Sequence, residues 1–281
     1  MMRGMFAAIS GLKQHQVMLD VTANDIANVN TIGYKSARVT FADSLTQMQR
    51  GAAGATTATG GSNAAQVGLG VGLGSIDNLM TGGARQTTGN PLDVAIEGDG
   101  FFQIGTGSPT GDQSPIAATK YTRAGNFSIS TEGYLTTQTG EYVIGYHQPQ
   151  AANPDGVGIQ IPEGATGVAI DQSGGVSYVD PQTNTRVTPY RLTLATFTNA
   201  SGLERDGGNS WITSANSGQK VVNTPGIGGA GTTNAGSVEM SNVDLSQTFT
   251  NMITAQRGFQ ANSRVISTAD SMLEELVNLK R

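Results

Sequence analysis

The N-terminal segment carries apolar or small side chains at alternating steps of three and four residues, the spacing of one face of an α-helix. Only Gln16 is polar within this frame, whose other members are Met2, Met5, Ile9, Leu12, Leu19, Ala23 and Ile26. Because the stripe continues for more than three heptads, it is typical of a coiled-coil seam. We therefore expect a long terminal helix that buries this stripe against another helix.

The C-terminal segment repeats the pattern. Asn262 interrupts a frame that consists of Met252, Ala255, Phe259, Ile266, Ala269, Leu273 and Leu276 and is widened by Phe249, Ile253 and Val277. One such stripe alone is usually the core-facing side of a helix, but stripes at both ends of a chain favour pairing of those ends. Gln16 and Asn262 either specify the register of the pairing or face solvent.

The middle of the chain has short apolar runs separated by Gly, Asn and Asp, a pattern that predicts β-strands and turns. "LDVAIEGDGFFQI" (92–104) predicts a hairpin with its turn at Gly98 to Gly100, and "YTRAGNFSISTEGYLTT" (121–137) predicts another around Gly133. Further strands are expected at "YVIGY", "GIQIP", "GVAID", "GVSYV" and "YRLTLATF". This spacing indicates an antiparallel sandwich or barrel.

Two glycine-rich stretches, 51–74 and 224–236, have the composition of flexible linkers. The expected fold class is therefore mainly β with terminal α-helices. It comprises paired N- and C-terminal coiled-coil helices (1–34 and 238–281), an extended, partly Gly-rich connector (35–90), and an antiparallel β-rich body that includes the C-terminal connector (91–237).

Assembly with other copies is expected because a lone amphipathic helix is marginally stable in water. We expect the termini to be disordered in a monomer and ordered in a polymer, and residues 51–74 to order against neighbouring subunits. The sparse charge fits such an assembly. Contacts with few directional ion pairs can shift register at small cost.

Composition excludes several classes. Charged residues make up 13% of the chain, against about 25% in an average soluble domain. A net charge of −5 with scattered Lys and Arg gives no basic face for nucleic acid, and there is no cysteine. No apolar stretch approaches the roughly 18 residues that span a bilayer. "MMRGMFAAISGLKQHQ" has no long apolar core, so we expect no cleaved signal peptide.

Catalytic chemistry finds little support. His15 and His147 lack the spacing of a metal site and are interpreted as surface residues. "GLGVGLG" lacks the Lys-Ser/Thr of a phosphate-binding loop. Glu97 and Asp99 are interpreted as part of a glycine turn rather than as an acid–base pair or a calcium loop. We expect a protein that is not an enzyme, with no catalytic residue, metal or cofactor.

"NDIANVNTIGY" (24–34) joins the first helix to the connector. Asn30 and Gly33 suit the end of a helix, while Asn24 and Asn28 lie four residues apart on one face. These two amides either bridge to a neighbouring helix or subunit or belong only to the helix end. The expected subunit–subunit residues are Met5, Ile9, Leu12, Leu19, Asn24, Ile26, Asn28, Met252, Phe259, Asn262, Ile266, Leu273 and Leu276.

Both terminal segments resemble those of the bacterial flagellar rod and hook family. The resemblance rests on "SGLKQHQVMLDVTANDIANVNTIGYKSARVTFADSL", on "SNVDLSQTFTNMITAQRGFQANSRVISTADSMLEELVNLKR", and on body motifs including "LDVAIEGDGFFQI" and "NASGLERDGGNSWITSANSG". It implies a structural subunit that polymerises helically into the flagellar axial tube. It also implies paired helices at the tube interior, an outer β-body, and unfolded export through the flagellar export apparatus without a cleaved signal.

Within that family, "TFADSL" and "QVGLGVGLGSI" are more similar to hook subunits, the flexible joint that transmits motor torque to the filament. The alternative is a subunit of the distal rod, a straight drive shaft. The resemblance implies self-association and partners among the distal rod, hook cap and hook–filament junction proteins, in the hook or basal body outside the cytoplasm. A secreted β-rich binding module is the remaining alternative; trimming about 30 residues from each end would leave its function intact.

Overall fold

The computed structural model describes residues 2–55, 60–107, 118–147 and 156–279. The chain divides into two compact units. One, which we call the helix-and-ribbon unit, contains residues 1–27, 37–77 and 244–281. The other, the β-body, contains residues 28–36 and 78–243. The chain therefore passes between the units four times.

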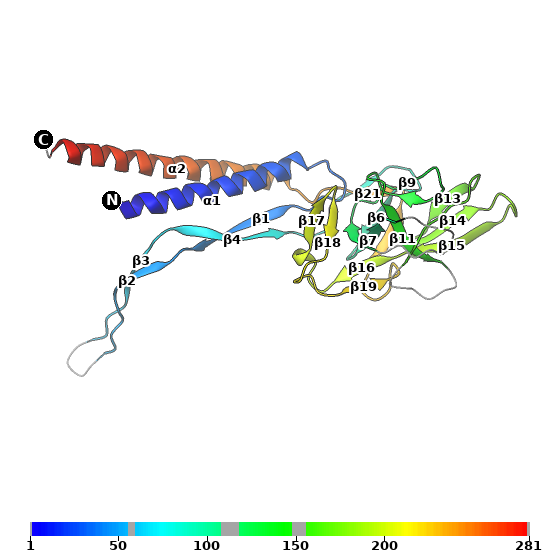
Figure 1. The fold of residues 1–281 in the computed structure, drawn as a ribbon, viewed down its shortest axis with the longest axis horizontal. Coiled ribbons are helices and arrows are strands. Elements are labelled where there is room, and N and C mark those ends of the chain that lie inside the picture. Colours follow the sequence, from blue (N-terminus) through cyan, green and yellow to red (C-terminus); the bar gives the residue numbers. More distant parts are fainter. Residues whose placement is uncertain (1, 56–59, 108–117, 148–155, 280–281) are drawn as a thin grey trace. The chain divides into compact units, whose positions relative to one another are not determined.

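The helix-and-ribbon unit is built around two helices, α1 (Met2–Ala27) and α2 (Leu245–Asn278). They run side by side with the two chain termini at the same end, so the pair is antiparallel (Figure 1). The carboxylate of Asp244 caps α2, because it accepts hydrogen bonds from the backbone N–H groups of Ser246 and Gln247. Such a side-chain cap satisfies donors that have no partner within the helix.

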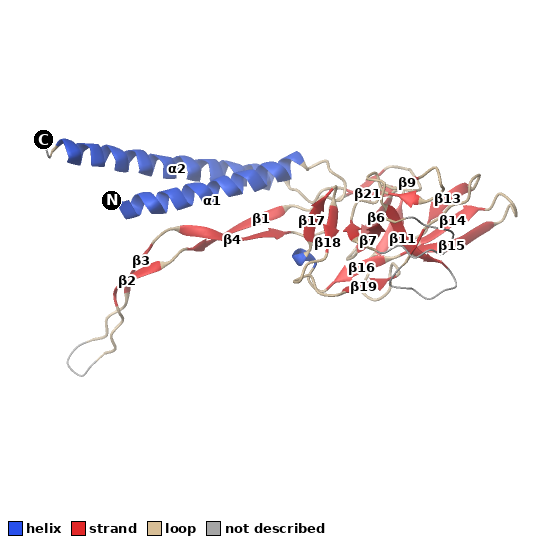
Figure 2. Cartoon of the chain, viewed as in Figure 1, coloured by secondary structure: helices blue, strands red, loops and turns tan. Residues whose placement is uncertain are grey.

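A long β-ribbon completes this unit (Figure 2). Its paired strands are β1 (Ala37–Asp43) with β4 (Val71–Asn78), and β2 (Thr46–Arg50) with β3 (Ala65–Gly68). Backbone hydrogen bonds from Ser44 to Gly70 and from Leu69 to Leu45 join the two pairs. The glycine-rich sequence from 65 to 74 is thus largely strand within one chain, because Val and Leu alternate with its glycines. Residues 56–59 of the predicted connector lie outside the described residues.

The β-body holds the remaining strands, and every assigned pairing in its sheets is antiparallel. Its largest sheet follows the order β13-β14-β15-β11-β7-β8-β18-β17 among the described residues. The bounds are β5 (Arg85–Thr87), β6 (Val94–Glu97), β7 (Phe101–Gly105), β8 (Lys120–Thr122), β9 (Ser128–Ile129), β10 (Leu135–Thr136), β11 (Tyr142–His147), β12 (Val157–Gly158), β13 (Thr166–Ile170), β14 (Gly175–Val179), β15 (Arg186–Leu192), β16 (Leu194–Phe197), a 3-10 turn (Ala200–Gly202), β17 (Glu204–Gly207), β18 (Ser210–Ile212), β19 (Lys220–Asn223), β20 (Thr232–Ala235) and β21 (Ser237–Glu239).

The hydrophobic core lies inside the β-body. Its larger cluster centres on fully buried side chains such as Phe102, Leu135 and Leu192, and a smaller one surrounds Phe101 and Trp211. The rings of Phe102 and Phe127 meet edge to face, with centroids 5.0 Å apart, a favoured geometry for aromatic pairs. This unit therefore has the packed interior of an independent domain.

One of the two predicted hairpins is wrong. β6 and β7 flank the turn at Gly98 and Gly100 but do not pair with each other, since β6 pairs with β20 and β7 with β8, β11 and β16. Both glycines have positive φ, 109° and 127°, and lead the chain from one sheet into another. The second hairpin is confirmed: β9 pairs with β10 across a turn in which Gly133 has φ of 83°.

The predicted strand "YRLTLATF" is two strands. It breaks between β15 and β16 at Thr193, whose hydroxyl accepts a hydrogen bond from the Gln103 side chain and donates one to the backbone oxygen of Ile144. At this buried threonine the chain changes partners, since Leu192 pairs with Gly145 of β11 and Leu194 with Phe102 of β7. The predicted strands "YVIGY", "GVAID" and "GVSYV" match β11, β13 and β14 in place. The predicted strand "GIQIP" is wrong: β12 shares only Gly158 with it, and the rest forms no strand beyond an isolated bridge at Gln160.

Candidate assembly surfaces

The contact between α1 and α2 is made by small residues. Ala8 and Gly11 are buried on α1, and Ala255 and Ala269 on α2. The side chain of Asn262 fills the space over Gly11, where an added Cβ would lie 2.8 Å from Asn262 Nδ2. Small residues let two helix backbones approach closely, so this contact depends on missing side chains rather than on large apolar ones.

His15 fills the matching space on the other helix. An added Cβ at Gly258 would lie 2.5 Å from the His15 ring, and the ring also meets Phe41 of the ribbon edge to face at 5.8 Å between centroids. The interpretation of His15 as a surface residue is therefore wrong: it is half-buried where α1, α2 and β1 meet. His147 is also half-buried, with its ring 5.2 Å from that of Tyr190.

The predicted stripe on α1 is displaced by one position from this contact. Ala8, Gly11 and Thr22 are buried and His15 packs on α2 and the ribbon, whereas Met2 of the predicted frame is 55% exposed and Ala23 is exposed. The large members of the frame are only half-buried: Met5, Ile9, Leu12, Leu19 and Ile26. A count of hydrophobic residues misses the contact because its centre is Gly and Ala.

The predicted stripe on α2 lies closer to the observed contact, with Ala255 and Ala269 buried in it. Of its other members, Leu276 is 50% exposed, and the following are half-buried: Met252, Phe259, Asn262, Ile266 and Leu273. Asn262 meets Gly11 rather than Gln16, which is exposed. The two polar interruptions of the predicted seams therefore do not pair.

The end of α1 agrees with the predicted turn, and one residue that was not predicted, Asp25, also takes part in it. α1 ends at Ala27, and Gly33 adopts φ of 70°, as the turn prediction requires. Asn24 is exposed, while Asn28 is half-buried and its amide oxygen accepts a hydrogen bond from the Thr31 hydroxyl. Asp25, which the sequence patterns did not single out, is buried and accepts hydrogen bonds from the backbone N–H of Ala37.

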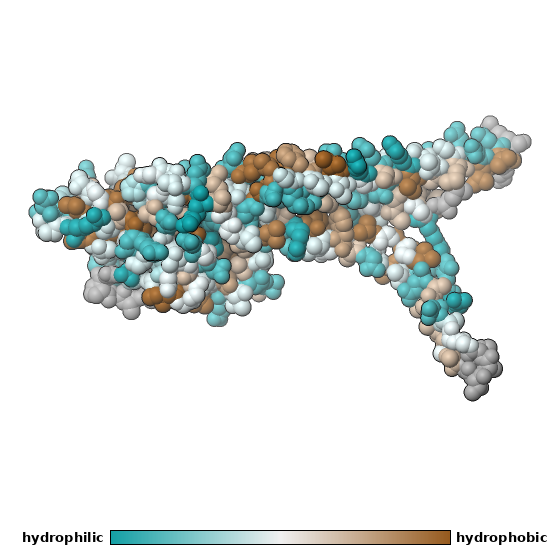
Figure 3. Space-filling model, turned by 180° about the vertical axis from the view of Figure 1, so that it is seen from behind, coloured by the Kyte–Doolittle hydropathy of each residue, from teal (hydrophilic) through white to brown (hydrophobic). Residues whose placement is uncertain are grey.

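Large apolar side chains reach the surface along the helices and the ribbon (Figure 3). The most exposed on the ribbon are Leu45 at 77% and Met48 at 60%. The other strongly exposed members of this unit are Met2, Phe6, Phe41, Val67, Leu69, Leu73, Ile76, Leu245, Phe249, Ile253, Val265, Met272, Leu276, Val277 and Leu279. A hydrophobic surface of this extent marks a site of protein association.

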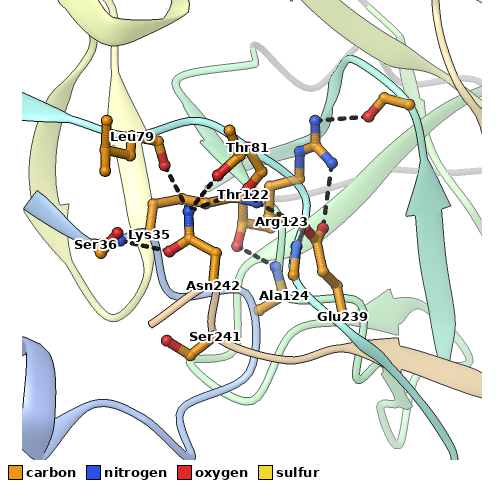
Figure 4. Close-up of polar contacts among 12 residues, drawn as sticks. Lys35, Ser36, Leu79, Thr81, Thr122, Arg123, Ala124, Glu239, Ser241 and Asn242 are labelled. Carbon is orange, nitrogen blue, oxygen red and sulfur yellow. Dashed lines mark hydrogen bonds and ion pairs between the residues drawn. The ribbon is translucent and has the colours of Figure 1, made fainter. Parts of the chain in front are cut away.

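The β-body contains a buried ion cluster (Figure 4). Glu239 Oε1 lies 2.6 Å from Lys35 Nζ, and Oε2 lies 3.2 Å from Arg123 Nη1. All three side chains are at most 3% exposed. Glu239 Oε1 also accepts a hydrogen bond from the Gly83 N–H at 2.9 Å. Although burial works to raise the pKa of Glu239, Arg123 and Lys35 together hold that pKa below its ordinary value of 4.5.

A further basic residue, Arg205, contacts several neighbouring segments of the β-body. The Arg205 guanidinium lies over the rings of Tyr34 and Trp211, at 4.9 and 5.2 Å from their centroids. It also donates hydrogen bonds to the backbone oxygen of Lys35 and to Asn78 Oδ1. Stacking on two aromatic faces and multiple donation are characteristic of arginine.

Three family profiles match the chain in sequence order. Residues 5–35 match "Flagella basal body rod protein", residues 95–178 match "Flagellar hook protein FlgE/F/G D1 domain", and residues 234–279 match "Flagellar basal body rod FlgEFG protein C-terminal". The chain is 45% identical over the full length of both chains to flagellar basal-body rod protein FlgG of Bacillus subtilis. The chain belongs to the flagellar rod and hook family.

Two further members of this family show its range. FlgG of Caulobacter vibrioides is 38% identical over 99% of this chain and 100% of its own. Flagellar hook protein FlgE of Borreliella burgdorferi is 27% identical in an alignment of 441 positions, against the 281 residues of this chain. Membership makes the chain a structural protein of the flagellar rod and hook family, a component of the flagellar basal body, rather than an enzyme.

The described part of the chain offers no conflicting site. Its His, Asp and Glu residues form no group of three that could hold a metal ion, and no described helix is long and apolar enough to span a membrane. Glu97 forms an ion pair with Arg85 at 2.9 Å, with both side chains about half exposed. Asp99 lies in the glycine turn, where its backbone oxygen accepts a hydrogen bond from Gly231.

Proposed function

We propose that this chain is the subunit of the distal flagellar rod, which polymerises helically into a straight drive shaft. The observation that carries the proposal is the 45% identity over complete chains to a protein named FlgG. The hook interpretation, favoured by short motifs in the sequence, has weaker support. The hook protein FlgE of Borreliella burgdorferi is 27% identical to this chain, and its alignment contains long insertions relative to this chain.

Polymerisation is supported by the composition of the helix-and-ribbon unit. Among its described residues, the buried hydrophobic side chains are three alanines: Ala8, Ala255 and Ala269. Its large apolar side chains are half-buried or exposed. Because burial of a Leu, Ile or Phe side chain contributes roughly 1.5–3 kcal/mol, these residues stabilise the unit only when other copies cover them.

The predicted assembly residues fit this proposal. Met5, Leu12, Leu19 and Ile26 recur every seven residues on α1, half-buried beside its contact with α2. The ribbon supplies a second surface, since an isolated pair of strands is marginally stable in water. We propose that other copies cover both, that the helix pair supercoils as a coiled coil in the tube wall, and that α1 and α2, which lie within the predicted ranges 1–34 and 238–281, form its inner domain.

The partners follow from that position. We propose neighbouring copies as the main partner, the hook and other rod subunits at the ends of the polymer, and the export apparatus as the route of delivery without a cleaved signal. The cap and junction proteins implied by a hook interpretation are less direct neighbours of a rod.

Electron microscopy of the purified chain after concentration tests the proposal. We expect straight rods, and curved tubes would favour the hook instead. A variant with Phe249→Ser and Ile253→Ser removes exposed apolar side chains of α2 and should stay monomeric. The matched control, Val221→Ser, changes an exposed apolar residue of the β-body and should polymerise normally.

A further inference from the structure

The β-body receives the chain through three linking segments that are far apart in sequence. These are residues 28–36 after α1, residues 78–84 from the last residue of β4 onward, and residues 237–243, which comprise β21 and the stretch before α2. The covalent chain passes between the two units only at these segments. Linking segments in most proteins are mobile surface loops.

In this chain the three segments are fastened to one another. Glu239 belongs to the third, Lys35 to the first, and Gly83, whose N–H donates to Glu239, to the second. Lys35 Nζ also donates to the backbone oxygen of Thr81 at 2.8 Å. One carboxylate and one ammonium group therefore join all three linking segments.

Arg123 attaches this junction to the interior of the body. Its guanidinium donates to Glu239 Oε2 and, at 2.9 Å, to the backbone oxygen of Gly98, and it lies over the ring of Phe101 in the smaller core cluster. Arg123 follows β8 and Gly98 follows β6. The linking segments are thus anchored to strands of the body rather than only to each other.

Asn242 repeats the arrangement with an uncharged side chain (Figure 4). Its Oδ1 accepts from the Ser36 N–H at 2.7 Å, and its Nδ2 donates to the backbone oxygen of Leu79 at 2.8 Å. Again one residue of the third segment bonds to the first and the second. Two independent side chains that make the same connection indicate a joint rather than an incidental ion pair.

We infer that Lys35, Arg123 and Glu239 form an internal clasp, which fixes the three linking segments to the β-body so that load passes into the body through side-chain contacts. The clasp is a property of the single chain, whereas the load that it carries rests on the proposed shaft function. A buried ion cluster suits a load-bearing joint, because loss of one partner leaves a buried charge uncompensated and partial opening is therefore strongly unfavourable.

Amide hydrogen exchange of the monomer tests the clasp itself. In Glu239→Gln we expect exchange to accelerate by about 100-fold or more at the Gly83 amide, which donates to the Glu239 carboxylate, and at the Gly33 amide, which donates to the Glu239 backbone oxygen beside it. The Leu135 amide, bonded to Ile159 within the body, should not change. Equal acceleration at Leu135, or none at Gly33 and Gly83, would overturn the inference.

Two further variants keep this result interpretable. Glu97→Gln removes the charge from an ion pair with roughly half-exposed side chains, and exchange at all three amides should remain unchanged. The triple variant Lys35→Met, Arg123→Met and Glu239→Met carries no buried charge at the clasp. We therefore expect it to fold even if Glu239→Gln alone does not. Gly83 should still exchange faster in it, because its acceptor is gone, and wild-type exchange there would count against the clasp.

Load bearing is measured separately. Cells whose rods carry Glu239→Gln should assemble straight rods but lose swimming speed mainly in viscous medium, relative to cells that carry Glu97→Gln. If exchange changes as expected and swimming in viscous medium does not, the clasp carries no load. Curved polymers of the wild-type chain would instead contradict the rod function and leave the exchange result standing.

Discussion

The two units differ in where their large apolar side chains lie. In the β-body these side chains fill a core, and among the described residues only Ile129, Val221 and Ile227 are strongly exposed large hydrophobics. In the helix-and-ribbon unit the buried hydrophobics are alanines, and Leu, Ile, Met and Phe reach the surface. The β-body has its core within a single chain, whereas under the proposed function neighbouring copies cover the apolar side chains of the helix-and-ribbon unit.

The same difference appears in their polar residues. The β-body encloses a Lys–Glu–Arg cluster with side chains at most 3% exposed, whereas the ion pair between Arg38 and Asp77 in the ribbon is 62% and 39% exposed. Surface pairs contribute little to stability. The rigid connections are therefore concentrated in the body and in the segments that enter it.

The largest effect should come from one substitution made in both units. Phe102→Ala opens a cavity in the core, where Phe102 is fully buried, and should lower the free energy of unfolding of the body by about 3–5 kcal/mol. Phe249→Ala, at a residue that is 49% exposed, should change monomer stability by about 0.5 kcal/mol or less yet impair polymerisation. Chemical denaturation and sedimentation of both variants would measure the contrast. If the two substitutions destabilise the monomer to a similar extent, the two units do not differ in where their large apolar side chains contribute to stability.

Acid should destabilise the body through the clasp. The pKa of Glu239 lies below 4.5 in the folded protein, so its carboxylate stabilises the fold above about pH 4.5, and that contribution is lost as the pH falls through the lower folded value. Arg85 stands opposite Glu239 in the β5–β21 ladder, but its guanidinium pairs with Glu97. Thermal melts of the monomer from pH 6 to pH 3 should show a steeper loss for wild type than for Glu239→Gln. Parallel curves would exclude a contribution from this carboxylate.

Gly258→Ala should weaken the helix contact by about 1–3 kcal/mol, because the new Cβ would lie 2.5 Å from the His15 ring. His15→Ala should relieve most of that strain in the double variant. The readout is polymer stability against denaturant, with Gly4→Ala as control, because an added Cβ at Gly4 meets no atom within 4 Å. A double variant no better than the single one would show that His15 is not the obstacle.

The smallest effect concerns the helix end. Asn24→Ala with Asn28→Ala should stabilise the helix of an isolated peptide of residues 2–30 by a few tenths of a kcal/mol per residue, since Ala favours helix within α1 and just past its end. We expect weaker polymerisation all the same if these amides bridge to a neighbouring subunit, as the sequence predicts. If assembly is unchanged, the two asparagines belong only to the helix end and have no role in assembly. Asp20→Ala, on an exposed position of the same helix, is the control.

Periodicity predicted the helices because apolar spacing persists over many turns, and it predicted short strands because the turn glycines recur. It placed the α1 contact one position away, since Gly11 and Ala8 have too little side chain to register as hydrophobic. It paired β6 with β7, because nearness in sequence does not reveal that Gly98 and Gly100 carry the chain to a different sheet.

The clasp could not be predicted from the sequence. Lys35 and Glu239 are 204 residues apart, and nothing in their local sequence distinguishes them from ordinary surface charges. Only the folded β-body brings them together. The local sequence gives no signal either, since the motif before Lys35 carries Asp25 and the motif around Arg123 carries Glu132.

Hydrogen exchange of the complete chain, as monomer and as polymer, tests the central distinction most directly. In the monomer the β-body strands β7 and β11 should be strongly protected, while α2 and the ribbon exchange close to the rate of an unfolded chain. In the polymer, α2 and the ribbon should become protected as neighbouring copies cover their apolar side chains. A monomer in which α2 is already protected as strongly as β7 would contradict this account.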